Sequence, residues 1–596
     1  MKRPNQSDPV AAEVTRRSSA TGADARPPRH LVGYNLRGLL VLCFAALLFL
    51  ALPTRDADAA PRRGFAATVH PLATEAALDA MRRGGNAVDA TVAAGLMLGV
   101  VDGHNSGIGG GCFLLIRLAN GEVVAIDGRE TAPAAATRDM FIRKGKADAG
   151  LSQAGALAAG VPGEVAAFHT AITRYGRRPW REHCFAAARV AERGFKLTPG
   201  LVERLNATAP ELEQFAATRL TLLKPGGTPW IAGEIFQQPD LAQTLRSLAA
   251  GGPDWFYRGS FAAATASWMK SNGGLLNAAD FAAYRVRFRQ PVRTTYRGYE
   301  VIGFPPPSSG GVHVGQILNI LEHFDLRALG ANTAEFVHVV AEAMKLAFAD
   351  RAHWLGDPDF APVPRGLVDR AYAAELAMKI DRTRAMKVSG HGTPPNAASD
   401  VFSKHTTHFS TADADGNWVA CTATINTSFG SKVVVPGTGV VLNNEMDDFS
   451  AQPGQANFFG LIGAEANAIA PGKRPLSSMS PTIVLRDRQP ILSLGAAGGP
   501  TIITQTLLAI LHHVDFGCGP AEALAQPRFH QQWSPDELRI ENAFPESVRA
   551  DLVRRGHRLK EVEAMGACQM IARDPSGGRL SGAADPRVCD GTASGW

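Results

Sequence analysis

The chain has few cysteines, and their spacing excludes the commonest metal and redox motifs. Seven cysteines occur among 596 residues, and no two of them form a C-x-x-C pair. Zinc ribbons and thioredoxin-like centres need such pairs. Cys43 would be lost with a cleaved leader, and the others are expected to be buried free thiols. Cys568 with Cys589 is the one pair considered for a disulfide, since an exported protein permits one.

Motifs of several large enzyme classes are also absent. Neither G-x-S-x-G nor H-E-x-x-H is present, which argues against the commonest serine-hydrolase and zinc-protease sites. The glycine-rich run at residues 106–112 has neither G-x-G-x-x-G nor a Walker A lysine, so it predicts no nucleotide site. We interpret it as a tight turn before a buried strand. The sequence predicts no cofactor and no metal.

The charge of the chain gives no sign of a nucleic-acid partner. Charged residues make up 19% of the sequence, and the formal net charge is +6. Residues 1–59 carry eight Lys or Arg and five Asp or Glu, which leaves only +3 for residues 60–596. That excess is far from the basic surface that nucleic-acid binding needs. The 45% share of hydrophobic residues is ample for a core.

No hydrophobic run has the length of an ordinary membrane-spanning helix. The apolar run Leu39–Leu52 has 14 residues, follows Arg37 and precedes the A-x-A sequence at residues 57–59. A spanning helix needs about 20 residues, whereas this length suits the apolar core of a signal peptide. We interpret residues 1–59 as a leader for export to the periplasm or out of the cell. An uncleaved N-terminal anchor is the alternative.

The periodicity of apolar residues predicts a mixed α and β protein. Residues 65–101 are expected to form two alanine-rich helices, and residues 154–379 are mainly helical in pattern. Two strands are predicted within residues 112–127, around an Ala-Asn-Gly turn. Residues 501–513 are expected to form a helix whose two terminal histidines face solvent or an interface. Residues 440–450 predict a short strand that runs into a polar loop.

A second hairpin is predicted on either side of Asp415-Gly416. The flanking residues 404–410 and 418–426 alternate polar with apolar or β-branched side chains. With a two-residue turn at Asp-Gly, Thr406 comes opposite Ile425. The preceding segment is rich in Gly, Pro, Ser and Asn, which indicates an exposed loop. Such a loop therefore leads directly into a threonine at the start of a strand.

Thr406 is a candidate nucleophile because of where the chain would be cut. A threonine hydroxyl is a weak nucleophile unless a base lies beside it, and cleavage before Thr406 would create that base as its own α-amino group. This group has a pKa of about 8, so part of it is a free base near neutral pH. Taken alone, Thr-Thr-His-Phe-Ser is more simply an ordinary strand. The motifs that follow it reverse this interpretation.

The order of these motifs resembles a known family. Thr406-Thr-His-Phe-Ser is followed by Asn426-Thr-Ser-Phe-Gly, Leu442-Asn-Asn-Glu-Met-Asp-Asp-Phe-Ser, Pro471-Gly-Lys-Arg-Pro-Leu-Ser-Ser-Met-Ser-Pro and Gly498-Gly499. This order resembles the small subunit of the γ-glutamyltransferases, enzymes of the N-terminal nucleophile hydrolase superfamily. The resemblance covers essentially all of the chain after residue 64. It implies an α+β fold, the four-layer αββα sandwich, and self-processing into two chains.

The resemblance implies a catalytic group of four residues. Thr406 would be the nucleophile, and Thr424 would orient it. Gly498 and Gly499 would offer backbone N–H groups as an oxyanion hole, because glycine allows a close approach. No cofactor takes part in this chemistry.

The resemblance also implies how a γ-glutamyl group would be recognised. A guanidinium can bind a carboxylate through two parallel hydrogen bonds, and an ammonium group needs acceptors and negative charge. The α-carboxylate of the substrate would be bound by Arg129, Ser477 and Ser478, and its α-ammonium by Asn426, Glu445 and Asp448. Residues 451–472 would form a lid, in which Phe459 replaces the tyrosine of some relatives.

These expectations divide the chain into three parts. Residues 1–59 would be the leader, residues 60–405 a large subunit and residues 406–596 a small catalytic subunit, the last two in one heterodimer. The expected substrates are glutathione and other γ-glutamyl compounds, with water, an amino acid or a dipeptide as acceptor. Two alternatives remain, a cephalosporin acylase that removes a glutaryl side chain and an unprocessed binding protein without activity. Glu445 and Asp448 argue against the first, because a glutaryl group has no cation.

Overall fold

The structure, a computed structural model, describes residues 63–397, 409–574 and 578–596. All of them belong to one compact unit, Pro61–Trp596. The leader, the predicted cleavage site and Thr406 lie outside the described residues.

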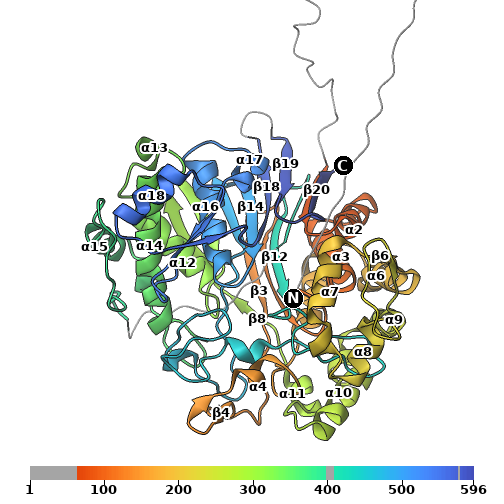
Figure 1. Cartoon of the computed structure of the whole chain (residues 1–596). Coiled ribbons are helices and arrows are strands. Elements are labelled where there is room, and N and C mark those ends of the chain that lie inside the picture. Colours follow the sequence, from red (N-terminus) through yellow and green to blue (C-terminus); the bar gives the residue numbers. More distant parts are fainter. Residues whose placement is uncertain (1–62, 398–408, 575–577) are drawn as a thin grey trace, which may run out of the picture. The chain divides into compact units, whose positions relative to one another are not determined.

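Two large antiparallel sheets form the middle of this unit (Figure 1). The first contains, in order, β20 (Thr592–Gly595), β1 (Gly64–Thr68), β11 (Ser410–Asp413), β12 (Trp418–Thr424), β2 (Gly111–Arg117), β3 (Val123–Gly128) and β8 (Arg287–Arg289). The second contains β19 (Leu580–Ala584), β18 (Ala567–Arg573), β14 (Gln489–Ala497), β13 (Thr482–Arg486), β10 (Tyr299–Gly303) and β9 (Val292–Tyr296). The sheets contact each other directly, and Oγ of Ser410 lies 2.9 Å from Oγ of Ser493 between them.

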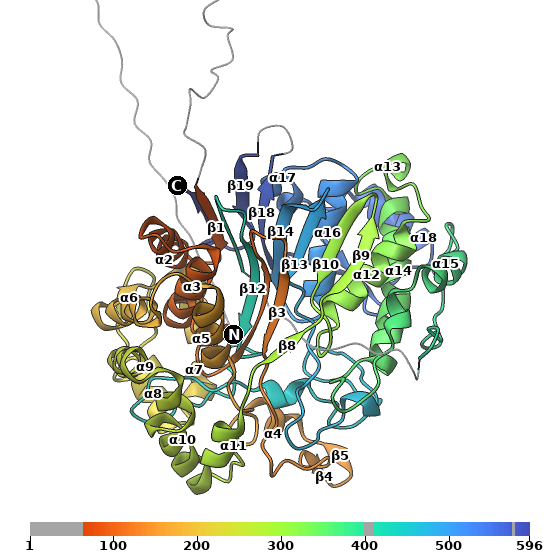
Figure 2. The same ribbon diagram turned by 180° about the vertical axis from the view of Figure 1, so that it is seen from behind.

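Helices cover the outer face of each sheet (Figure 2). The first sheet is covered by α2 (Pro71–Arg82), α3 (Ala87–Val101) and α5 (Glu164–Tyr175), and α6 (Trp180–Arg193) and α9 (Pro239–Tyr257) pack on the outside of these helices. The second is covered by α12 (Gly310–Leu321) and α16 (Thr501–Val514), and α14 (Ala334–Trp354) and α15 (Arg370–Met378) pack against α12. Two extended apolar cores result, one beneath each helical layer. The four-layer αββα sandwich expected from the resemblance is therefore confirmed.

Smaller elements complete the described part of the chain. The remaining helices are α4 (Ala149–Gln153), α7 (Pro199–Leu212), α8 (Ala216–Leu222), α10 (Ser260–Ser271), α11 (Ala278–Ala283), α13 (Leu326–Leu329), α17 (Pro520–Ala525), α18 (Glu546–Arg554) and the short 3-10 turns η1 (Arg365–Val368), η2 (Glu445–Asp448) and η3 (Glu465–Asn467). Minor sheets join β4 (Ile142–Arg143) to β5 (Lys146–Ala147), β6 (Phe195–Lys196) to β7 (Ile235–Phe236), and β15 (Phe529–His530), β16 (Leu538–Glu541) and β17 (Leu559–Val562). None of the described helices is both long and apolar enough to cross a membrane.

Several local predictions were wrong. Residues 64–68 form a strand, because β1 is paired on both sides by β11 and β20 from distant parts of the chain. Residues 287–303 contain three strands within the stretch predicted as mainly helical. Residues 440–450 form no extended strand, since Val441 makes a single bridge and η2 follows. The side chain of His512 is buried rather than exposed.

The hairpin around residue 415 is correct, but its turn is one residue longer than predicted. Asp413 and Asn417 close a three-residue loop in which Gly416 has φ of +94°. The backbone and side-chain N–H groups of Asn417 both donate to the carboxylate of Asp413, at 2.9 and 2.7 Å. A three-residue loop with a left-handed residue is a common hairpin connection. It pairs Ser410 with Ala420, which shifts the predicted register by one residue.

Candidate active site

One large cavity brings the described candidate residues together. Its volume is about 1070 Å³. All nine candidates that the structure describes line it: Arg129, Thr424, Asn426, Glu445, Asp448, Ser477, Ser478, Gly498 and Gly499. Arg129 comes from the part predicted to be the large chain, and the others come from the part predicted to be the small chain.

Arg129 follows the end of β3 and is held from several sides. Its backbone N–H donates to Asp127 at 2.7 Å, and its carbonyl accepts from the hydroxyl of Tyr284 at 2.8 Å. The guanidinium Nε donates to the carbonyl of Pro475 at 3.2 Å. Only 1% of the side chain is exposed, so the positive charge lies at a fixed place beneath the cavity.

The guanidinium of Arg129 is paired with the acids that were predicted to bind the ammonium group. Nη1 lies 2.7 Å from Oε2 of Glu445, and Nη2 lies 2.6 Å from Oδ2 of Asp448. Both acids belong to η2. The groups expected to bind the two charges of an amino-acid head thus lie next to each other.

Ser477 and Ser478 do not contact Arg129 directly. The hydroxyl of Ser477 accepts from the backbone N–H of Met479 at 3.3 Å. The hydroxyl of Ser478 accepts from Nη2 of Arg351 at 3.0 Å. The two serines line the same cavity as Arg129, and their expected role beside it around a bound carboxylate stays a prediction.

Arg351, on α14, is a residue that sequence reasoning missed. It is 4% exposed, and its Nε donates to the hydroxyl of Ser309 at 2.9 Å. A buried arginine in the last turn of a largely apolar helix is unusual, because burial of a charge is costly unless it is paired. That contrast was the available signal. His353, two residues further on, is expected from the sequence to be structural rather than catalytic; it stacks on His391 at a ring distance of 3.5 Å and does not line the cavity.

Thr424 ends β12, and Asn426 lies in the loop that follows, two residues further on. The Thr424 hydroxyl accepts from the backbone N–H of Asn426 at 2.8 Å, which leaves its own hydrogen to donate towards the cavity. Asn426 has φ of +78°, a conformation that asparagine tolerates better than most residues. Its side-chain nitrogen donates to the carbonyl of Asn444 at 3.0 Å, so its oxygen is the atom suited to accept from a ligand.

Gly498 and Gly499 lie between β14 and the start of α16. Their φ angles are +131° and +60°, and both favour glycine. A Cβ atom on Gly499 would come within 2.5 Å of the ring of Phe459, which lies in the predicted lid. The positive end of the α16 dipole and the free N–H groups at its start favour a negative charge here.

The glycine-rich run before β2 serves close packing rather than phosphate binding. A Cβ atom on Gly109 would lie 1.9 Å from the carbonyl of Val441, and one on Gly110 would lie 2.0 Å from the carbonyl of Thr424. Glycine therefore allows this segment to approach the backbone on which Thr424 and η2 are placed. The interpretation as a turn into a buried strand is consistent with this packing.

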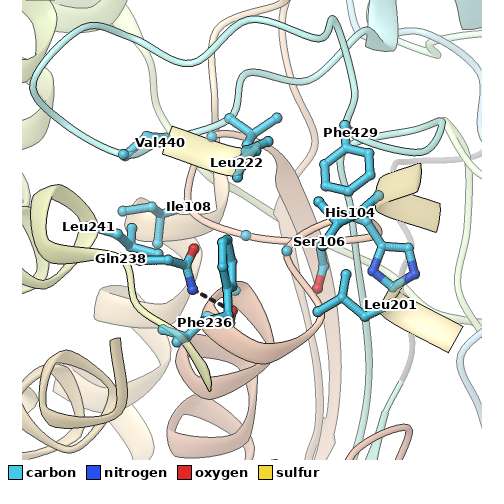
Figure 3. A pocket seen from close by; sticks show the side chains of 18 residues that line it. His104, Ser106, Ile108, Leu201, Leu222, Phe236, Gln238, Leu241, Phe429 and Val440 are labelled. Carbon is cyan, nitrogen blue, oxygen red and sulfur yellow. Dashed lines mark hydrogen bonds between the residues drawn. The ribbon is translucent and has the colours of Figure 1, made fainter. Parts of the chain in front are cut away.

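A second pocket next to the cavity is too small for a substrate. His104 and Ser106 line both spaces. The pocket measures about 30 Å³, enough for about one water molecule. Apolar side chains such as Leu222 and Phe236 surround it, and its Gln238 amide already donates to Val100 at 2.9 Å (Figure 3).

Among the residues that the structure describes, one cluster has the composition of a metal site. Ligand atoms of His338, Glu342 and His557 lie within 4.8 Å of one another. Nδ1 of His338 and Nε2 of His557 are hydrogen-bonded at 2.7 Å, and Nε2 of His338 lies 2.7 Å from the carbonyl oxygen of Asp381. Nζ of Lys345 lies 3.0 Å from Glu342. Because an ammonium group already neutralises this carboxylate, we assign no metal to the cluster.

Comparisons with known proteins agree with this site. Residues 73–596 match the family model described as Gamma-glutamyltranspeptidase. The glutathione hydrolase proenzyme of Escherichia coli K12 is 44% identical over 537 residues, which cover 90% of this chain and 92% of that protein. The Acylase ACY 1 proenzyme of Pseudomonas sp. SE83 is 40% identical over 539 residues, or 89% of this chain and 93% of that protein.

Solved structures show the same fold. The cephalosporin acylase from Bacillus halodurans has a TM-score of 0.81 and 31% identity, over 92% of this chain and 98% of that chain. The gamma-glutamyltranspeptidase of Helicobacter pylori has a TM-score of 0.54 and 39% identity, over 56% of this chain and 95% of that chain. Both kinds of activity therefore occur on this scaffold.

Proposed function

This chain belongs to the gamma-glutamyltranspeptidase family, and from that premise we propose how its residues act. The protein is an enzyme of the glutathione hydrolase and γ-glutamyltransferase type. It breaks the γ-glutamyl amide bond of glutathione or a related compound. The γ-glutamyl group passes to water, or to an amino acid or peptide.

The proposed nucleophile is the hydroxyl of Thr406. Its α-amino group, released by self-cleavage between His405 and Thr406, takes the hydroxyl proton as the oxygen attacks the γ-carbonyl carbon. If β11 continues in its observed register, Thr406 comes opposite Thr424. The Thr424 hydroxyl is then placed to donate to the nucleophile. The amide nitrogen leaves with the proton, and an ester remains on Thr406.

The oxyanion formed during attack is stabilised by the N–H groups of Gly498 and Gly499. Removal of one such donor typically lowers the rate by about a hundred- to thousandfold. Water or an amine then attacks the ester carbonyl through a second tetrahedral intermediate, whose oxyanion is bound in the same place, and its proton passes to the Thr406 oxygen as the ester bond breaks. The second attack regenerates the Thr406 hydroxyl.

Recognition of the γ-glutamyl group follows from the charges in the cavity. Arg129 is proposed to bind the α-carboxylate, with Ser477 and Ser478 beside it. Asn426, Glu445 and Asp448 are proposed to bind the α-ammonium.

The mature protein is proposed to be a heterodimer. Cleavage would give a large chain of residues 60–405 and a small chain of residues 406–596. Export, with removal of residues 1–59, is part of the same proposal. The pairing of β1 and β2 with strands of the small chain supports stable association after cleavage.

One observation carries the proposal, the presence of both amino-acid-binding charges in one cavity beside Thr424 and Gly498. The test compares hydrolysis of γ-glutamyl and glutaryl anilides, which differ only in the α-ammonium group. We expect kcat/KM for the γ-glutamyl compound to be at least about a hundredfold higher, since loss of a buried charge contact costs about 3 kcal/mol. A preference for the glutaryl anilide would contradict the proposal.

The second candidate is a cephalosporin acylase, favoured by the fold likeness and by the related acylases. Glu445 and Asp448 argue against it, because a glutaryl side chain has no cation for them. The anilide comparison distinguishes the two activities directly.

A further inference from the structure

Three carboxyl groups surround the guanidinium of Arg129. Glu445 and Asp448 lie 2.7 and 2.6 Å from it, and Oε2 of Glu130 lies 3.8 Å from Nη1. Asp448 is the most exposed of the three side chains, at 12%. Each unpaired buried charge costs several kcal/mol, so one arginine cannot support three carboxylates. The set therefore holds at least one proton.

Other charged groups near Glu445 leave this conclusion unchanged. Arg129 is the cation, and Glu130 and Asp448 are the acids, that interact with Glu445 itself. Arg351 adds a second positive charge near Asp448. Arg474 is paired with Asp127 at 3.0 Å. Glu164 adds a further buried acid, and its carboxyl oxygens have no hydrogen-bond partner.

The physical environment indicates which acids carry protons. Burial raises the pKa of Glu445 well above its ordinary value, although Arg129 opposes the effect. Burial likewise raises the pKa of Glu130 to about 8. Glu445 and Asp448 contact the two terminal nitrogens of the same guanidinium, at 2.7 and 2.6 Å, so their carboxyl groups lie close together. Two carboxylates in one buried site repel each other, which favours retention of a proton by the pair.

We propose that Glu445 and Asp448 share one exchangeable proton in the empty site, and that the α-ammonium group of the substrate replaces it on binding. This inference rests on the proposed function and deepens it. The ammonium N–H groups take the place of the shared proton, which passes to solvent. Binding of a γ-glutamyl compound is then coupled to proton release.

The charge balance supports this exchange. In the empty site Arg129 and Arg351 outweigh Asp448, because both glutamic acids are protonated. Loss of the proton from Glu445 brings the set to neutrality. An amino-acid head carries one charge of each sign, so its binding leaves the set neutral. A glutaryl group brings only its negative charge and has nothing to replace the proton.

The direction of the pH dependence follows from linkage. The ammonium group binds the deprotonated pair. The affinity for glutamate therefore rises with pH until the pH exceeds the pKa of Glu445 in the enzyme without ligand. A ligand without the ammonium group gains nothing from that deprotonation. The preference for γ-glutamyl over glutaryl compounds should therefore increase with pH.

The test is calorimetric titration of the processed enzyme with L-glutamate at about pH 6.5, where free carboxyl groups are ionised. Phosphate and imidazole both buffer at this pH and differ in ionisation enthalpy, so the difference in heat gives the number of protons released. We expect about one proton per glutamate bound. Glu445→Gln keeps the shape of the side chain but has no carboxyl proton to exchange. The number of protons that this variant releases on binding glutamate should fall close to zero.

Glutarate is the matched control ligand, and it should release no proton. Equal heats in both buffers for bound glutamate would overturn the inference and leave the proposed function intact. Failure of glutamate to bind at all would instead contradict the proposed function. If Glu445→Gln does not bind glutamate, titration of the wild-type enzyme at higher pH serves as the second test. The number of protons released per glutamate must then decline as pH rises, and a number that does not change with pH would contradict the exchange.

Discussion

Lysine could supply the positive charge of Arg129 but could not reproduce the geometry of its guanidinium. Its guanidinium contacts Glu445, Asp448 and the carbonyl of Pro475 at once. The lysine ammonium is a point charge without the planar fork. We expect Arg129→Lys to lower kcat/KM for γ-glutamyl anilide by about a hundredfold, or roughly 3 kcal/mol, mainly through KM.

Steady-state kinetics checks this expectation. Arg82→Lys is the matched control, because Arg82 lies on the surface of α2, where its side chain is 40% exposed and pairs with Glu75. It should leave kcat/KM within about twofold, as an exposed pair contributes little. Equal effects of the two substitutions would refute the role of Arg129.

Gly499 permits a second residue-scale prediction. A side chain there is disfavoured by a φ of +60° and by the ring of Phe459 at 2.5 Å. Either effect would move the N–H group that is proposed to face the oxyanion. Gly499→Ala should lower kcat by about a hundred- to thousandfold with a smaller change in KM.

A control separates local strain from the loss of catalysis. Gly437 also has a positive φ, of +70°, and a Cβ atom there would meet nothing within 4 Å. Gly437→Ala should lower stability slightly and leave kcat unchanged. If kcat fell as far in this variant, general strain rather than the position of the N–H group would explain the result.

At the scale of elements, the hairpin of β11 and β12 depends on Asp413. Its carboxylate accepts from Asn417 and also from the backbone N–H of Ala87 at the start of α3, at 2.9 Å. Asp413→Ala leaves these buried donors without an acceptor. We expect a loss of about 2–4 kcal/mol in the free energy of unfolding and a smaller fraction of self-cleaved protein.

Urea denaturation and the ratio of cut to uncut chain measure both effects. Asp415→Ala is the control in the same loop, since Asp415 is half-exposed and pairs with Arg177 at the surface. Its effect on the free energy of unfolding should stay within about 0.5 kcal/mol. A stable, fully processed Asp413→Ala protein would show that the clamp is unnecessary.

Local patterns predicted some elements well and others poorly, for physical reasons. The helix over α14 and the hairpin of β11 and β12 have strong periodicity or turn signals of their own. Strand β1 has an alanine-rich sequence, and only pairing with β11 and β20 makes it extended. The turn length at Asp413 depends on side-chain hydrogen bonds, which the Asp-Gly pattern does not reveal. A one-residue error there shifts the register of the whole hairpin.

In the candidate site, too, some features were predicted from the sequence and others were not. Family motifs identified the cavity residues, because these lie in long ordered sequences such as residues 442–450. The motifs did not reveal that Ser478 contacts Arg351 rather than Arg129. Contacts between side chains from α14 and from the loop after η3 depend on packing across the molecule. Such contacts have no signature in either segment.

In the molecule as a whole, the first sheet contains strands from both predicted chains. Strands β1, β2 and β3 belong to the large chain, whereas β11, β12 and β20 belong to the small chain. The six cysteines in the described part of the chain are all free. Association after cleavage should therefore depend on packing, strand pairing and buried ion pairs rather than on a covalent link.

Self-cleavage provides the last prediction. Intact mass measurement under denaturing, non-reducing conditions should find two chains, the smaller one beginning at Thr406, while native gel filtration finds them together. Thr406→Ala should remain one uncut and inactive chain, because it lacks the hydroxyl required for attack on the preceding peptide bond. Thr407→Ala, one residue further on, should still be cut. A cleaved and active Thr406→Ala protein would contradict the assignment of the nucleophile. A small chain released only after reduction would show that a disulfide joins the subunits.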